Sequence, residues 1–130
     1  MDTPFLSLLR ERMTWLHQRQ DLLAQNVANA DTPRYAARDL KAQDFSDALK
    51  KVTNPTTSMT VTNARHIALS NTRASQFEDL KSPDIETSPN GNSVSLETQM
   101  IKVSDTQAQF AAAANLYAKA MTMIKTAIGR

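Results

Sequence analysis

Apolar residues recur at alternating steps of three and four in two segments at opposite ends of the chain. The N-terminal positions are Leu6, Leu9, Met13, Leu16, Gln20, Leu23, Val27 and Ala30. The C-terminal positions are Leu96, Met100, Val103, Gln107, Phe110, Ala114, Tyr117, Met121, Ile124 and Ile128. A repeat of this kind over several heptads is typical of a coiled coil. We therefore expect two long helices that pair along this seam, with Gln20 and Gln107 as buried polar residues that fix the register.

Proline and glycine indicate where the two helices begin and end. Thr3 is a plausible N-cap and Pro4 is tolerated in a first helical turn, so we expect the first helix over residues 4–31. The second helix is expected over residues 94–128, because proline and glycine are absent there and Gly129 follows.

The segment between the two helices has a different composition. Residues 32–93 hold four of the five prolines together with clusters of Ser, Thr and Asn. So polar a stretch is weakly ordered unless it packs on something, and we expect a loosely ordered, partly extended middle. The fold class is mainly α: one domain over residues 1–130, in which the N- and C-terminal helices pair as an antiparallel coiled-coil hairpin.

A second apolar stripe lies about 130° around each helix from the seam. It consists of Leu8, Trp15 and Leu22 on the first helix, and of Leu116 and Met123 on the second. A two-helix hairpin cannot bury both stripes, so we expect this one to contact neighbouring subunits. Under that interpretation, a charge at Trp15 spares pairing within the chain and blocks polymerisation. The alternative is that the middle segment folds back over these faces.

Composition leaves little room for enzyme chemistry or nucleic-acid binding. The net charge is only +2, there is no cysteine, and two glycines are too few for a phosphate-binding loop. Asp39, Asp44 and Asp47 are scattered over a polar stretch, where we expect them to be solvated. Arg12 and Arg19 share one helix edge, from which they could pair with acidic residues of a neighbour. We expect no catalytic residues, cofactor or metal site, and no nucleic-acid or small-molecule partner.

The end of the first helix carries a specific motif. The chain reads QNVANADTPRY over residues 25–35. Asn and Asp bond to the local backbone and Pro33 cannot continue a helix, so this is a helix exit. The pattern formed by Asn26, Ala28, Asn29, Thr32, Pro33 and Tyr35 resembles the signature of bacterial flagellar rod and hook proteins.

Other segments resemble one group within that superfamily, the proximal rod proteins of the flagellar basal body. The similar segments are residues 35–45, the His-Ile pair at residues 66–67, residues 90–100 and the C-terminal residues 121–128. The chain departs from the family pattern at Arg34, where the family usually has glycine. A left-handed conformation there would strain Arg34 by about 1 kcal/mol or more, so we expect a turn that is not left-handed.

The resemblance implies a structural role without catalysis. The implied protein is a subunit that assembles helically into the rod, the drive shaft that links the membrane ring and export gate to the distal rod. Its implied partners are copies of itself, other rod subunits, a membrane-ring/rod adaptor and the flagellar type III export gate. It would reach the periplasmic rod through that system without a cleaved signal peptide. The alternatives are another short rod component and a closed, soluble coiled-coil adaptor.

Export substrates of this class carry a short element in which phenylalanine precedes an apolar residue by four positions. The chain offers Phe5 with Leu9 and Phe45 with Leu49. Leu9 is better explained as part of the helix seam, so we favour Phe45 and Leu49. The alternative for that pair is a small local hydrophobic contact.

Overall fold

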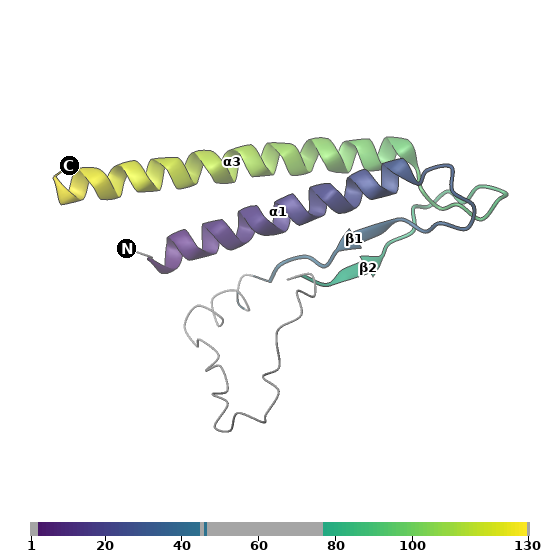
Figure 1. Ribbon diagram of the computed structural model, residues 1–130, viewed down its shortest axis with the longest axis horizontal. Helices are drawn as coiled ribbons and strands as arrows, with labels where there is room; N and C mark the ends of the chain where they lie inside the picture. Colours follow the sequence, from purple (N-terminus) through teal and green to yellow (C-terminus); the bar gives the residue numbers. More distant parts are fainter. Residues whose placement is uncertain (1–2, 45, 47–76, 130) are drawn as a thin grey trace, which may run out of the picture.

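Two long helices and a short two-stranded ribbon make up the computed structural model, which describes residues 3–44, 46 and 77–129. The elements are α1 (Pro4–Ala28), β1 (Arg38–Leu40), β2 (Asp79–Lys81) and α3 (Leu96–Ile128). The two helices lie side by side and antiparallel, and the β1–β2 ribbon packs along α1 on the side away from α3 (Figure 1). The predicted mainly helical hairpin of terminal helices is confirmed.

The helix ends follow from local chemistry. At the start of α1, the Thr3 hydroxyl accepts a hydrogen bond from the Leu6 N–H at 3.4 Å. The helix ends at Ala28 rather than at residue 31. Asn29 leaves the helical conformation, and its side-chain amide donates to the Gln25 carbonyl at 2.7 Å. This local bond satisfies one of the last carbonyls of the helix, so the helix can stop before Pro33.

The second helix also starts slightly later than expected. α3 begins at Leu96 rather than at residue 94, because the Ser95 N–H is held by the Asp84 carboxylate at 2.7 Å. A carboxylate beside the first turn is stabilised by the positive end of the helix dipole. At the other end, Gly129 adopts a left-handed conformation with φ of 81° and caps the helix.

The β1–β2 ribbon covers a face of α1 that we expected to contact neighbouring subunits. Its strands are antiparallel, with Asp39 paired to Leu80 in the register. The ribbon lies over Trp15, whose indole N–H donates to the Lys41 carbonyl at 3.0 Å, and Phe77 joins the same apolar cluster. Trp15 and Leu22 are consequently only 4% and 8% exposed. For Trp15 and Leu22, the structure therefore shows the alternative given above, in which part of the segment between the helices folds back over α1.

The line of closest contact between the helices differs from the expected seam on one side only. On α1 it uses the expected leucines Leu6, Leu9, Leu16 and Leu23, all buried. On α3 the buried residues are Gln99, Thr106, Ala113 and Ala120, spaced seven apart. These are mostly small or polar side chains, and small side chains let two helix backbones approach closely.

Candidate functional site

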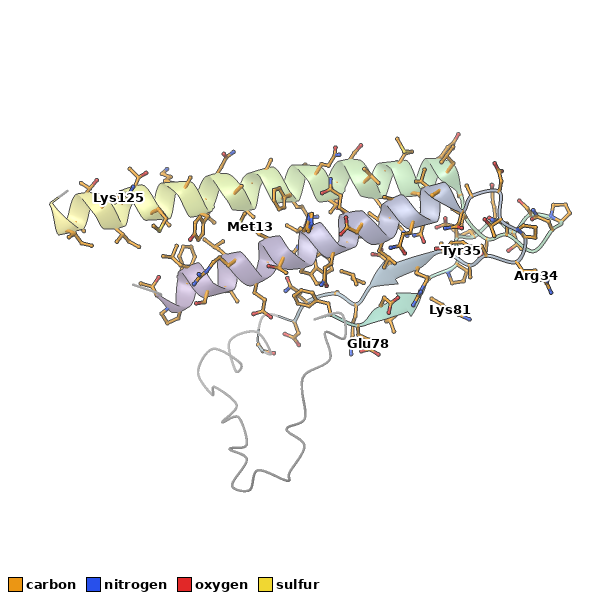
Figure 2. The ribbon with its side chains drawn as sticks, in the orientation of Figure 1. Met13, Arg34, Tyr35, Glu78, Lys81 and Lys125 are labelled. Atoms are coloured by element: carbon orange, nitrogen blue, oxygen red, sulfur yellow. The ribbon has the colours of Figure 1, made fainter. Side chains whose placement is uncertain are left out.

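Four of the ten expected seam positions on α3 are displaced by one residue from the buried line. The expected positions Met100, Gln107, Ala114 and Met121 each lie one residue after a position on the buried line. Met100 is 51% exposed and Leu96 is 52% exposed, and Gln107 is also exposed, so this part of the prediction is wrong. The half-buried seam residues lie beside the line: Met13, Gln20, Val27, Val103, Phe110, Ala114, Tyr117, Met121 and Ile124. The side chains between the helices, Met13 among them, can be followed in Figure 2.

The second stripe is divided by the fold. Trp15 and Leu22 lie beneath the β1–β2 ribbon and Leu8 is half-buried, so Trp15 and Leu22 cannot contact a neighbour without rearrangement. Leu116 and Met123 on α3 stay 45% and 57% exposed. Only the α3 half of the stripe therefore presents a large apolar surface.

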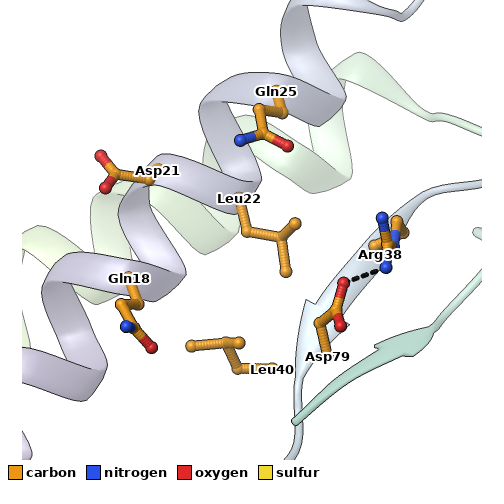
Figure 3. A pocket seen from close by; sticks show the side chains of 7 residues that line it. All are labelled: Gln18, Asp21, Leu22, Gln25, Arg38, Leu40 and Asp79. Carbon is orange, nitrogen blue, oxygen red and sulfur yellow. Dashed lines mark ion pairs between the residues drawn. The ribbon is translucent and has the colours of Figure 1, made fainter. Parts of the chain in front are cut away.

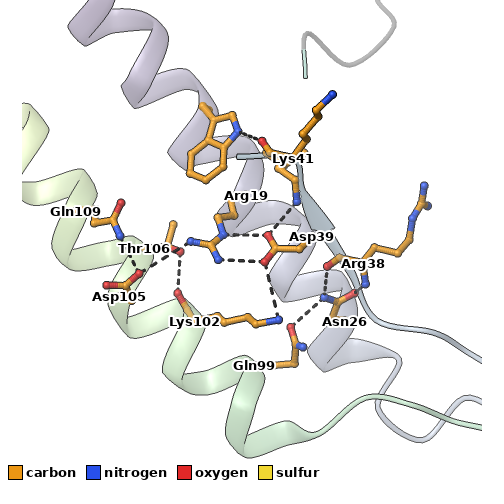
Figure 4. A network of polar contacts seen from close by, with 12 residues as sticks. Arg19, Asn26, Arg38, Asp39, Lys41, Gln99, Lys102, Asp105, Thr106 and Gln109 are labelled. Carbon is orange, nitrogen blue, oxygen red and sulfur yellow. Dashed lines mark hydrogen bonds and ion pairs between the residues drawn. The ribbon is translucent and has the colours of Figure 1, made fainter. Parts of the chain in front are cut away.

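Asn26, the first residue of the motif, is the centre of a buried polar junction (Figure 4). Its side chain is completely buried. The amide nitrogen donates to the Arg38 carbonyl at 2.6 Å and to Gln99 Oε1 at 2.9 Å. The amide oxygen accepts from the Tyr35 hydroxyl and from the Arg38 N–H, both at 3.1 Å. All donors and acceptors of this amide are used, and they join α1, β1 and α3 at one point.

The junction continues along α3 as a chain of polar contacts. Gln99 Nε2 donates to Asp84 at 3.0 Å, and the Lys102 ammonium lies 3.8 Å from both Asp84 and Asp39. Asp39 accepts two hydrogen bonds from the Arg19 guanidinium, at 2.9 and 3.0 Å. Bidentate pairs of this kind fix geometry as well as charge. Asp39 is therefore paired within the fold and is not a solvated carboxylate.

Arg12 and Arg19 both lie against the buried Trp15 ring. Their guanidinium carbons lie 4.6 and 5.5 Å from its centroid, within the range of cation–π contact. Arg12 donates to Gln109 of α3 at 2.7 Å, and burial, followed by the charge of Arg19, lowers its pKa. Both arginines thus bind groups of their own chain, and their pairing with acidic residues of a neighbour stays a prediction.

The remaining motif residues build the turn after α1. The Thr32 hydroxyl donates to Asn29 Oδ1 at 3.1 Å. Asn92, from the segment before α3, donates to the carbonyls of Asn29 and Thr32 at 2.9 and 2.7 Å. Asn92 is 2% exposed, so one buried amide ties the two loops together. Ala28, the last residue of α1, and Pro33 in the turn are both exposed and complete the sequence pattern.

Arg34 adopts the left-handed conformation that we did not expect, with φ of 59°. Its N–H donates to the Asn90 carbonyl at 3.1 Å, which holds this turn against the loop before α3. A side chain at Gly91 would place its Cβ 3.2 Å from Arg34 Cγ, so the two loops touch closely. The turn therefore keeps a glycine-type backbone although arginine occupies it, at a cost of about 1–2 kcal/mol. Arg34 lies at the end of the molecule opposite the termini (Figure 2).

Sequence reasoning missed Asp84, Asn92, Gln99 and Lys102, four of the residues that build the junction. The Asn-Gly-Asn sequence at residues 90–92 is a turn signal, and it could have pointed to Asn92. The other three gave no local signal, because their partners lie on distant segments.

Within residues 3–44, 46 and 77–129, no cluster of His, Asp or Glu has the makings of a metal site. In the same ranges, no helix has the length and apolar character needed to cross a membrane. Phe45, Leu49 and His66 lie outside the described residues, so the export element at Phe45 and Leu49 stays a prediction. In the other candidate pair, Phe5 is 50% exposed and Leu9 is buried.

Comparison with known proteins gives a consistent result. A family model described as "Flagella basal body rod protein" matches residues 7–35, which include the motif at the end of α1. The flagellar basal body rod protein FlgB of Yersinia enterocolitica is 32% identical over 111 residues, covering 81% of this chain and 79% of the relative. FlgB of Escherichia coli (strain K12) is 34% identical over 112 residues, covering 81% and 78%.

A more distant organism gives the same match. FlgB of Agrobacterium fabrum is 30% identical over 106 residues, covering 79% of this chain and 76% of the relative. The similarity thus extends from α1 well beyond the segment matched by the family model. This chain, with its paired terminal helices and its Asn26-centred junction, belongs to the FlgB family of flagellar basal body rod proteins.

Proposed function

We propose that this chain is a structural subunit of the proximal rod, assembling helically into the drive shaft that transmits torque. The observation that carries the proposal is the outer surface of α3. Met100, Ile101, Leu116 and Met123 are all at least 45% exposed along this helix. Fully burying an exposed side chain of this kind is worth roughly 1.5–3 kcal/mol, and neighbouring subunits that cover the remaining exposed area would gain part of that for each.

The partners and location follow from the same assignment. The partners are copies of this chain, other rod subunits, the membrane-ring/rod adaptor and the export gate at its base. The chain reaches the periplasmic rod through the flagellar type III system, and Phe45 with Leu49 serves as the recognition element. We assign it no catalytic activity, which agrees with the rod-protein names of its relatives.

A complementation experiment tests the assignment. The gene is placed in a flagellated strain that lacks its own FlgB, and in parallel strains that each lack another short rod component. Restored swimming and complete basal bodies in the FlgB-deficient strain alone would support the proposal. Rescue of a different rod deletion would favour the alternative of another short rod component, and no rescue anywhere would contradict the proposal.

Sedimentation separates a rod subunit from a closed adaptor. A rod subunit should form larger, open-ended assemblies as its concentration rises, because heterologous contacts do not close. A coiled-coil adaptor should give one small species of fixed size at every dilution. Circular dichroism of the same samples would show whether helix content rises with assembly.

A further inference from the structure

A pocket of about 250 Å³ opens between α1 and the β1–β2 ribbon (Figure 3). Leu22 and Leu40 supply its apolar wall, and Gln18, Asp21 and Asp79 supply polar groups. Pockets for drug-sized ligands enclose roughly 300–1,000 Å³. This smaller space suits a single long side chain.

One buried acceptor in the pocket lining has no donor. Gln18 Oε1 is buried and has no hydrogen-bond partner within the described residues. Asp21 is 66% exposed at the rim, with the His17 imidazole 3.9 Å away. Asp79 forms an ion pair with Arg38, so the lining holds two carboxylates and one guanidinium. A side chain that is cationic and only donates, such as lysine, matches this chemistry.

The second half of α3 carries such a group on an exposed apolar face. After Asp105 the sequence contains lysines but no aspartate or glutamate. Lys119 is exposed and forms no ion pair with a carboxylate in the described ranges. It lies three residues after Leu116 and four before Met123, so these three side chains share one face of the helix. Leu116 and Met123 are 45% and 57% exposed.

The face around Lys119 cannot fill the pocket of its own chain. The β1–β2 ribbon packs on one side of α1 and α3 packs on another (Figure 1). The pocket and the Lys119 face are therefore two separate surfaces of one molecule. When such surfaces join head to tail between copies, the contact is heterologous, and its repetition gives a ring or an open assembly.

We propose that the pocket receives Lys119 from a second copy of this chain. The lysine stem packs against Leu22 and Leu40, and its ammonium binds Asp21 and Gln18 Oε1. Leu116 and Met123 become covered at the rim. This inference rests on the proposed function, since it names the contact by which copies of the subunit join.

Charge reversal tests the contact in purified full-length protein. Asp21→Lys and Lys119→Asp should each raise the concentration at which sedimentation detects assembly by at least about tenfold, because like charges then meet in the pocket. An equimolar mixture of the two variants should assemble near the wild-type concentration, since each supplies the group the other needs. Circular dichroism would verify that both variants keep their helices.

Matched controls place the same charge changes elsewhere. Asp31→Lys changes an exposed residue outside the pocket, and Lys125→Asp changes a residue about 120° around α3 from Lys119. Both should assemble within about twofold of wild type, which is near the effect of a surface charge. A control that disrupts assembly as strongly as Lys119→Asp would overturn the proposed contact.

Cysteine crosslinking provides a second readout, because the chain contains no cysteine of its own. A mixture of Asp21→Cys and Lys119→Cys should form crosslinked pairs of the two variants, whereas Asp21→Cys with Lys125→Cys should not. If wild type assembles but neither charge reversal nor crosslinking behaves as stated, only the pocket contact is refuted. A wild-type chain that stays monomeric at all concentrations would refute both this contact and assembly between copies.

Discussion

Replacing Asn26 with alanine should destabilise the fold strongly, although the change removes only a short side chain. Four hydrogen bonds end on this amide, to Gln99, Tyr35 and both backbone groups of Arg38. Each such bond contributes about 0.5–1.5 kcal/mol net, which gives a loss of about 2–6 kcal/mol in the free energy of unfolding. Native domains have about 5–15 kcal/mol in total, so the variant should be partly unfolded at moderate temperature.

Urea unfolding followed by circular dichroism measures this change, at a concentration where the protein is monomeric. Gln25→Ala is the matched control, because it truncates the neighbouring, exposed amide of the same helix. It should stay within about 0.5 kcal/mol of wild type. An Asn26→Ala variant that loses less than about 1 kcal/mol would refute the view that Asn26 holds the three elements together.

A double-mutant cycle with Gln99 makes the test sharper. Gln99 accepts from Asn26 and donates to Asp84, and it is completely buried. If the junction acts as a unit, Asn26→Ala and Gln99→Ala together should cost less than the sum of the two single changes. The expected coupling is about 0.5–3 kcal/mol, and full additivity would show that the two amides act independently.

Three further predictions concern stability and use the same unfolding assay. Trp15→Glu should lower the free energy of unfolding by about 3–5 kcal/mol, because it buries a charge beneath the ribbon, whereas Thr14→Glu on the exposed side should change little. Arg34→Gly should raise the free energy of unfolding by up to about 1 kcal/mol by relieving the left-handed strain, and Arg34→Val should lower it. Equal stability of these two variants would contradict the reasoning. Ala113→Leu should cost about 1–3 kcal/mol by forcing the helices apart, while Ala112→Leu, on the exposed side, should be nearly neutral.

The candidate junction was only partly predictable. The motif identified Asn26 and Tyr35, because their spacing at a helix exit matches a known pattern. It did not reveal that Gln99 binds Asn26, 73 positions away, or that Asn92 donates to the Asn29 carbonyl, 63 positions away. A buried amide can be recognised only from the groups to which it hydrogen-bonds. When those groups lie this far apart in the sequence, only the folded structure shows which of them meet.

The sequence by itself determined that two helices form, where they start and stop to within about three residues, and that they pair. The period of apolar residues and the Thr3, Pro4 and Gly129 signals are local, so they need no knowledge of the fold. Tertiary structure decided which face of α3 meets α1. Close approach of the two helices favours small side chains such as Ala113, and Gln99 must lie where Asn26 can bind it. For these two reasons the line of α3 residues that contacts α1 lies one residue before part of the most apolar stripe. Tertiary structure also decided that the ribbon covers Trp15, because only packing of a distant strand supplies the Lys41 carbonyl that its indole N–H requires.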